Sequence, residues 1–244
     1  MIRFSVTLFA LLLLSPMTAQ PALSSDEASS RLTLIELFTS QGCSSCPPAD
    51  HFLQKLADEP GILALSWSVD YWDYLGWRDT FARPEFTARQ KAYNHALGKS
   101  GVYTPQMVIA GRYEVVGSRT DEVRGLIAQS RKDSPAMMIG LEQDGALLRA
   151  FPLSGEITRP LTVWLVGFDD RRDVVIRAGE LKGRTMSYRN VVSEAKDIGT
   201  LSPGTGGFEL NMENIEGIRG NRHAILFQQG AGGPIVAAHR ITIP

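Results

Sequence analysis

Residues 32–50 read LTLIELFTSQGCSSCPPAD, and this stretch decides the predicted fold. It begins with a short apolar run over 32–38 that is typical of a buried strand. A turn follows, and then Cys43 and Cys46, the two cysteines of the chain. Apolar side chains recur at helical spacing over 44–58, with two prolines in the first turn, where a missing N–H costs little. The sequence therefore predicts a strand, a dithiol and a helix in direct succession.

The same kind of pattern continues through the first half of the chain. The run 62–69 predicts a second strand, parallel to the first because a helix connects them. An aromatic-rich insertion, 70–83, follows it, and Pro84 opens a second helix. Two short strands over 107–116 form a hairpin, and Thr120 caps a third helix. The predicted order of elements is β-α-β-α-β-β-α.

Beyond residues 132–135 (KDSP), which have the composition of a domain boundary, the helical period disappears. Short apolar runs separated by turn residues predict strands instead. These runs cover 137–143, 146–151, 161–168, 174–177, 188–195, 208–212, 223–228 and 235–243. Short strands with regular breaks favour a β-sandwich. We therefore expect an α/β domain over 31–134, followed by an all-β, sandwich-like domain over 136–244.

The N-terminal residues predict export. Residues 1–24 combine an early positive charge, an apolar run too short to span a membrane, and small residues suited to cleavage. This layout is typical of a secretory signal peptide, and a retained N-terminal anchor is the alternative. No other segment has the length and apolar content of a membrane span, so we expect none after cleavage. The mature protein is expected to be periplasmic or secreted, in an oxidising environment.

Composition excludes several classes of function. The 244 residues carry 25 basic and 26 acidic side chains, a net charge of −1, which argues against nucleic acid as a partner. Two cysteines cannot build a disulfide-stapled scaffold or a four-thiolate zinc site within one chain. The four histidines are scattered, and no phosphate-binding loop is present. We therefore expect no cofactor and no metal site.

The position of the two cysteines predicts redox chemistry. Cys43 lies at the expected helix start, where free N–H groups and the helix dipole stabilise a thiolate. Cys46, one turn further on, is placed to attack a mixed disulfide formed at Cys43. Cys43 is thus the predicted nucleophile and Cys46 the resolving cysteine. Glu36, in the preceding strand, is a candidate proton relay to Cys46, and the alternatives are an exposed strand edge or pairing with an arginine.

Two further segments are candidates for substrate binding. Thr104-Pro105 directly precedes a predicted strand, where a cis proline turn would leave a backbone edge free for a substrate peptide. The alternative is a trans proline that starts an edge strand. Asp70, Tyr71 and Trp72 follow the second strand and should emerge at the same sheet edge as the cysteines. The alternative is that these rings only cover the insertion itself.

The residues 36–50 (ELFTSQGCSSCPPAD) and 69–77 (VDYWDYLGW) resemble a bacterial family of secreted thioredoxin-like proteins, the domain of unknown function 1223. The resemblance extends over 32–131 and implies a thioredoxin-like fold for the α/β domain. It also implies that the two cysteines form a redox pair and that Thr104-Pro105 is a cis-proline loop. Gly42 stands where ordinary thioredoxins have tryptophan, and the cysteines enclose no Gly-Pro, so the direction of electron flow stays open.

The expected function is that of an exported thiol–disulfide oxidoreductase. Its partners would be protein thiols or disulfides, or a small thiol, together with an unidentified redox partner. One alternative is a non-enzymatic module that holds Cu(I) or binds a partner through the dithiol, since soft thiolates favour Cu(I). Another is a structural disulfide on an adhesive scaffold, although so small a closed loop stabilises little.

Overall fold

Strands make up most of the regular structure in residues 32–133, 137–214 and 217–243, the parts of the chain that the computed structural model describes. The strands are β1 (Thr33–Thr39), β2 (Ile62–Ser68), β3 (Gln106–Ile109), β4 (Tyr113–Val116), β5 (Met138–Asp144), β6 (Leu147–Ser154), β7 (Leu161–Val175), β8 (Thr185–Leu201), β9 (Phe208–Asn211), β10 (Arg222–Gln229) and β11 (Ile235–Ile241). The helices are α1 (Pro47–Ala57), α2 (Pro84–Ala96) and α3 (Thr120–Lys132), with short 3₁₀ turns η2 (Asp73–Leu75) and η3 (Met212–Asn214). The predicted signal peptide and part of the predicted domain boundary lie outside the described residues.

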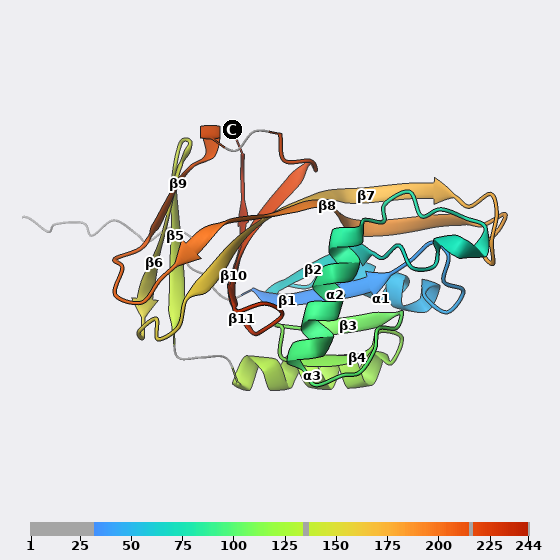
Figure 1. Ribbon diagram of the computed structural model, residues 1–244, viewed down its shortest axis with the longest axis horizontal. Coiled ribbons are helices and arrows are strands. Elements are labelled where there is room, and N and C mark those ends of the chain that lie inside the picture. The colour runs from blue at the N-terminus through green and yellow to red at the C-terminus, as the bar shows by residue number, and fades with distance from the viewer. Residues whose placement is uncertain (1–31, 134–136, 215–216, 244) are drawn as a thin grey trace, which may run out of the picture.

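One mixed sheet of eight strands runs along the molecule, in the order β11-β10-β7-β8-β2-β1-β3-β4 (Figure 1). A second sheet, β5-β6-β9, lies at one end. The long strands β7 and β8 form a hairpin that reaches from the second sheet to the far end, beside α1 (Figure 1). Within the described ranges, no helix has the length and apolar character needed to cross a membrane.

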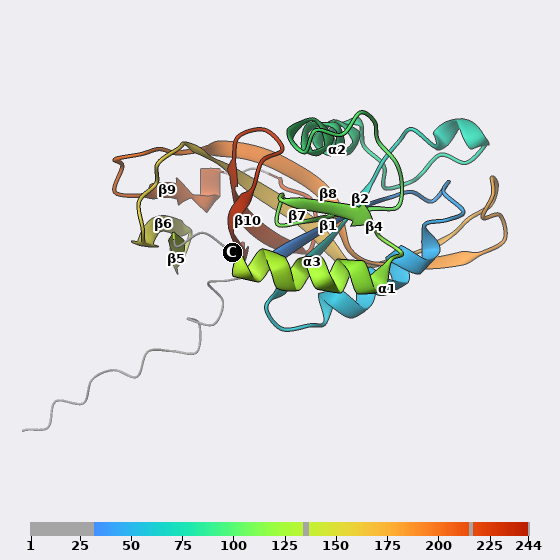
Figure 2. The same ribbon diagram turned by 90° about the horizontal axis from the view of Figure 1, so that it is seen from below.

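The helices cover both faces of the large sheet, with α1 and α3 on one face and α2 on the other (Figure 2). The alternation of side chains along β1 explains the two cores, because successive residues point to opposite faces of a sheet. Ile35 and Leu37 pack against α1 and α3, whereas Leu34 and Phe38 pack against α2. Glu36 therefore lies on the α2 face, and this alternation separates it from α1.

The predicted fold class, an α/β thioredoxin-like domain followed by a β-sandwich-like domain, is wrong. The protein is mostly β, and strands from both halves of the chain share one mixed sheet. The run 161–168 and the first two residues of the run 174–177 belong to one continuous strand, β7, and β8 pairs in parallel with β2 at Ser66 and Val191. An uncovered edge of β2 would leave its N–H and C=O groups unpaired, and β8 covers that edge. Local periodicity carries no information on which distant strand does so.

Asn190 secures the junction between β8 and β2. It is buried, and its φ of 48° places it in the left-handed region, where asparagine is tolerated better than most residues. Its side-chain Nδ2 donates a hydrogen bond of 2.8 Å to the Ala64 carbonyl. One side chain thus satisfies a backbone acceptor of β2 and permits the local turn of β8.

We expect Asn190→Ala to lower the free energy of unfolding by about 2 kcal/mol, because it removes a buried hydrogen bond and strains the backbone. Asn190→Gly removes the same hydrogen bond but accepts the positive φ, so its loss should be smaller. Urea denaturation of the two variants measures both effects. Equal stability of Asn190→Ala and the parent protein would contradict the assigned role.

Candidate functional site

Cys43 and Cys46 form a disulfide in the turn between β1 and α1. Both residues are buried, with 2% and 0% exposure, whereas Ser44 and Ser45 between them are exposed. The Cys46 amide donates to the Cys43 carbonyl at 3.2 Å, and the Ser45 hydroxyl lies 3.4 Å from Cys43 Sγ. The serine side chains of this segment therefore face solvent, whereas the two sulfur atoms are buried in the protein.

The helix starts later than the sequence pattern indicates. α1 begins at Pro47, and Cys46 occupies the N-cap position without making a side-chain cap bond. Pro47 and Pro48 supply no N–H, which suits the first turn of a helix, where such groups have no helical partner. Cys46, and not Cys43, therefore adjoins the helix directly.

Hydrogen bonds of the buried Gln41 hold the disulfide turn in place. Gln41, with 0% exposure, accepts a hydrogen bond of 2.8 Å from Trp77 Nε1 through its side-chain oxygen. Its backbone N–H donates to the Asp79 carboxylate at 2.7 Å, and its Nε2 donates to Thr80 Oγ1 at 3.0 Å. Five contacts of this kind join the residue two before Cys43 to the segment after η2.

Asp79 is a buried acid whose carboxylate oxygens accept hydrogen bonds from backbone amides. Its second oxygen accepts the Phe81 and Ala82 amides at 2.8 and 3.2 Å. Burial raises the pKa of Asp79 to about 6, although these amides and that of Gln41 oppose the rise. The geometry indicates a structural carboxyl group that organises the loop beside the disulfide.

Asp50 is a second buried acid, and sequence reasoning did not select it as a site residue. It lies on α1, four residues after Cys46, with 3% exposure. Its N–H donates the first helical hydrogen bond to the Cys46 carbonyl at 3.1 Å. Burial raises the pKa of Asp50 to about 7, the Thr39 hydroxyl opposes this, and Asp79 adds to it. The i, i+4 spacing from a reactive cysteine is the signal that would have found it.

Trp72 and the Thr104-Pro105 loop meet next to the disulfide turn. Trp72 Nε1 donates a hydrogen bond of 2.7 Å to Thr104 Oγ1. A Cβ atom added to Gly42 would lie only 3.0 Å from the Trp72 Cβ, so the indole residue packs directly on the turn. The Thr104–Pro105 peptide bond is cis. The structure thus joins Trp72 to the Thr104-Pro105 loop and places Trp72 against Gly42, the residue before Cys43.

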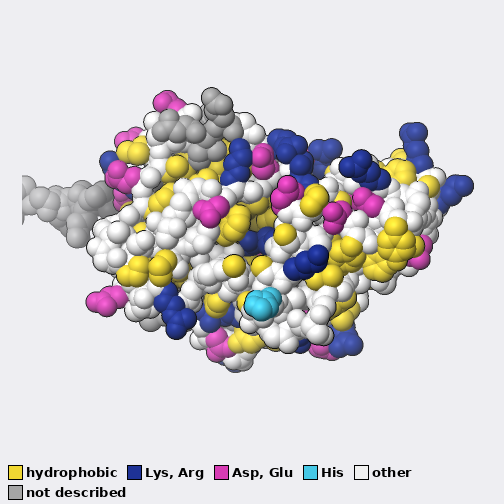
Figure 3. Space-filling view, in the orientation of Figure 1, with side chains coloured by type: hydrophobic (Ala, Val, Ile, Leu, Met, Phe, Trp, Pro, Cys, Tyr) yellow, Lys and Arg dark blue, Asp and Glu magenta, His cyan; other side chains and the backbone are white. Residues whose placement is uncertain are grey.

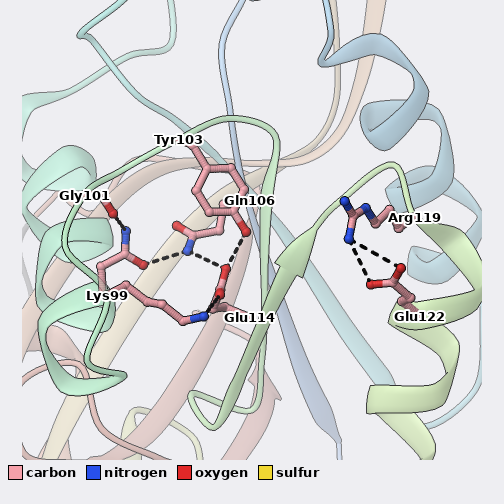
Figure 4. A network of polar contacts seen from close by, with 8 residues as sticks. Lys99, Gly101, Tyr103, Gln106, Glu114, Arg119 and Glu122 are labelled. Atoms are coloured by element: carbon pink, nitrogen blue, oxygen red, sulfur yellow. Dashed lines mark hydrogen bonds and ion pairs between the residues drawn. The ribbon is translucent and has the colours of Figure 1, made fainter.

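A hydrogen-bond network supports the loop that carries Thr104 (Figure 4). The Glu114 carboxylate accepts from Tyr103, from Gln106 Nε2 at 3.1 Å and from Lys99 Nζ at 2.6 Å. Gln106 Nε2 also donates to Asn94 Oδ1 on α2 at 2.6 Å. The loop is therefore tied both to β4 and to α2, which holds Thr104 in a defined position.

Asp70 and Tyr71 form hydrogen bonds to side chains of α2. Asp70 accepts a hydrogen bond of 2.6 Å from the Thr87 hydroxyl, and the Tyr71 hydroxyl donates to Gln90 Oε1 at 3.2 Å. Burial raises the pKa of Tyr71 to about 12. Tyr74, which is 77% exposed, stacks on Trp72 with ring centroids 6.4 Å apart. Hydrophobic side chains gather on the surface over this part of the molecule (Figure 3).

Glu36 lies on the other face of the sheet from α1 and its cysteines. Its carboxylate is fully buried and accepts a charge-assisted hydrogen bond of 2.7 Å from Arg89 Nε on α2. The Tyr93 hydroxyl also donates to it. Pairing with an arginine is the alternative that the sequence left open, and the structure does not bring Glu36 to Cys46.

The tip of the β7–β8 hairpin reaches the disulfide turn. Glu180 accepts a hydrogen bond of 3.3 Å from the Ser44 N–H, and a Cβ atom on Gly179 would lie 3.1 Å from the Trp77 Cβ. Gln54 of α1 donates to the Ser187 carbonyl of β8 at 2.9 Å. Residues from the second half of the chain therefore contact the disulfide turn and α1, although both cysteines belong to the first half.

Fold and site together define a mixed-sheet protein with a buried Cys-x-x-Cys disulfide at the start of a helix. Among the described residues, no group of three or more His, Cys, Asp and Glu side chains is placed to hold a metal ion. Residues 34–228 match the family described as protein of unknown function DUF1223, and the chain belongs to this family.

A solved relative supports the membership. The crystal structure of a protein from Agrobacterium tumefaciens is 30% identical to this chain, with a TM-score of 0.71. The similarity covers 87% of this chain and 94% of the Agrobacterium chain. Comparison with the curated proteins finds no match. The family and this relative thus define the fold, and the site geometry is what indicates the chemistry.

Proposed function

We propose that this protein is an exported thiol–disulfide oxidoreductase that uses Cys43 and Cys46 as its redox pair. The observation that carries the proposal is the disulfide at the start of α1, with Trp72 and the Thr104-Pro105 loop packed beside it. A bridge across three residues closes too small a loop to stabilise the fold much, so a structural role explains it poorly. A redox role accounts for the cysteine pair better than a structural role does.

In the proposed exchange, the partner is a protein dithiol. Its thiolate attacks Cys43 Sγ, the Cys43–Cys46 bond breaks, and Cys46 leaves as a thiolate that takes up a proton. The second thiol of the partner then loses its proton and attacks the mixed disulfide, which frees Cys43. The partner loses two electrons and becomes a disulfide, and this protein gains them as a dithiol. The reverse sequence oxidises this protein at the expense of a partner disulfide.

The geometry favours Cys43 as the sulfur that meets the partner. Cys46 is fully buried at the N-cap of α1, whereas Cys43 keeps 2% exposure and its Sγ lies 3.4 Å from the hydroxyl of the exposed Ser45. Glu180 contacts the Ser44 amide from the exposed hairpin tip, so a partner that docks on the turn displaces one solvent-facing contact. The stacked rings of Trp72 and Tyr74 offer an apolar surface next to this point.

Trapping the mixed disulfide tests this function. In Cys46→Ser, Cys43 should capture an unfolded protein disulfide as a covalent adduct that is visible on a non-reducing gel, because no resolving thiol remains. Cys43→Ser should form no adduct, and Asp58→Asn, a substitution at the exposed end of α1, should exchange like the parent protein. A Cys43–Cys46 disulfide that resists excess dithiothreitol, or the absence of an adduct in Cys46→Ser, would refute the proposal.

A further inference from the structure

The buried carboxyl group of Asp50 makes no hydrogen bond of standard geometry with any described residue. Neither of its oxygens meets hydrogen-bond geometry with a protein group, although the Thr39 hydroxyl lies near. An unpaired carboxylate in the protein interior costs several kcal/mol, and natural proteins satisfy nearly all such groups. A buried polar group that the fold leaves unsatisfied indicates a function other than stability.

Asp50 is also the acid nearest to Cys46 along the helix. Residues four apart on an α-helix lie on the same face, with about 5–6 Å between their Cβ atoms. Cys46 has helical backbone angles, and the Asp50 amide bonds to its carbonyl, so this spacing holds from the N-cap onward. Both side chains are buried, which denies Cys46 direct access to solvent protons.

The chemistry at Cys46 requires a proton. When the disulfide is reduced, Cys46 is released as a thiolate in the protein interior, where burial disfavours its charge. When the disulfide forms, Cys46 must lose its proton before it attacks. A nearby carboxyl group that changes protonation near neutral pH can supply and accept that proton.

We propose that Asp50 gives a proton to Cys46 when the disulfide is reduced and takes it back when the disulfide forms. This inference rests on the proposed exchange activity. On reduction, the S–S bond breaks, the electron pair leaves with Cys46 Sγ, and the Asp50 proton neutralises it, leaving a carboxylate. On oxidation, the Asp50 carboxylate removes the Cys46 proton, and the resulting thiolate attacks Cys43 Sγ in the mixed disulfide, which breaks the bond to the partner and releases the partner sulfur as a thiolate.

Burial, assisted by the charge of Asp79, keeps the Asp50 carboxyl protonated at mildly acidic pH, and the Thr39 hydroxyl opposes this effect. The Thr39 hydroxyl faces it from β1, and it interacts electrostatically with Tyr188 of β8 and with Asp79 from the segment after η2. Burial raises the pKa of Asp50 to about 7, and the negative charge of Asp79 acts in the same direction. Asp79 is itself occupied by three backbone amides, so it is not free to relay a proton.

The pH dependence of disulfide reduction tests this role. The rate of reduction by dithiothreitol is divided by the dithiothreitol thiolate concentration at each pH. The dependence on pH that remains in this normalised rate then comes from the protein. For the parent protein, this normalised rate should fall by about tenfold or more from about pH 5.5 to about pH 8.5, as Asp50 loses its proton. For Asp50→Asn, the rate should be flat and close to the low value of the parent protein at high pH.

Asp58→Asn is the matched control, because it removes the same charge from the exposed end of α1. Asp58→Asn should show the same dependence of the normalised rate on pH as the parent protein. Asp50→Glu should restore part of the dependence that Asp50→Asn loses. If Asp50→Asn fails to fold, ¹³C NMR of the Asp50 carboxyl in the parent protein replaces it. The midpoint of that titration should differ between the disulfide and dithiol forms, because interacting groups titrate together.

Several outcomes would overturn the inference. A slope unchanged in Asp50→Asn, or identical Asp50 midpoints in the two redox forms, would show that Asp50 passes no proton to Cys46. The proposed function fails separately, in the trapping experiment with a protein disulfide. Because dithiothreitol needs no docking surface, the Asp50-dependent slope can be present even when no protein adduct forms.

Discussion

Arg89→Met is expected to lower the free energy of unfolding by about 3–5 kcal/mol, because it leaves the Glu36 carboxylate buried without its partner. Glu36 has no exposed side-chain surface, and Arg89 Nε lies 2.7 Å from it. The same guanidinium donates to the Tyr93 hydroxyl at 2.9 Å and to Gln228 Oε1 at 3.2 Å. Urea denaturation near neutral pH measures the loss.

The aromatic surroundings of Arg89 add to this effect. Its guanidinium carbon lies 4.9 Å from the Trp67 ring centroid, 5.0 Å from that of Tyr93 and 5.4 Å from that of Trp164. Methionine keeps much of the apolar contact but none of the charge. The site therefore depends on a cation that is both ion-paired and stacked.

The double variant Glu36→Gln/Arg89→Met separates charge from packing. Removing both charges should recover a large part of the stability, since a buried ion pair replaced as a whole costs little. Arg89→Lys should be intermediate, because lysine keeps the charge but not the planar set of donors. A loss below about 1 kcal/mol for Arg89→Met would show that Glu36 is not held by this pair.

We expect the free energy of unfolding of Asp50→Asn to rise, relative to that of the parent protein, by about 4 kcal/mol from about pH 4 to about pH 8. In the folded state, the pKa of Asp50 is raised from 3.8 to about 7 by burial. Between these values the folded state binds more protons than the unfolded state. Asp50 thus contributes stability that is fully present below its unfolded pKa and is lost as pH rises through its folded pKa.

The comparison of two proteins removes the contributions of the titrating groups that do not interact with Asp50. Asp79, with its pKa raised to about 6 by burial, contributes a loss of the same sign in both proteins, and the measured difference includes its electrostatic coupling to Asp50. Urea denaturation of each protein at a series of pH values gives the difference directly. A difference that does not change with pH would mean that the folded and unfolded pKa values of Asp50 are alike. The outcome is independent of any redox partner.

Local patterns predicted the elements of the first half well. The apolar run before the cysteines forms β1, the prolines after them start α1, and the hairpin over 107–116 is β3 and β4. Each of these follows from side-chain spacing or turn residues within a few positions. The cis Thr104–Pro105 bond was implied by the family resemblance and is present.

The assembly of the sheet could not be predicted in this way. The pairing of β8 with β2 joins Ser66 to Val191, which are far apart in the sequence, and it merges the two expected units into one mixed sheet. Alternating hydrophobic residues mark β8 as a strand, but they do not indicate its neighbour. The choice depends on the edge groups of β2 and on Asn190, which meet only in the folded chain.

The same distinction applies to the candidate site. The sequence by itself determined that a dithiol lies between a strand and a helix, because Cys43, Cys46 and the prolines are local features. Only the tertiary structure decided that Glu36 lies away from that dithiol and that Asp50 is buried. The face of the sheet that α1 covers leaves Glu36 with Arg89 on the far side, and the packing of α1 buries Asp50. Partners that face one another across a sheet or along a packed helix are selected by burial, and burial is a property of the whole fold.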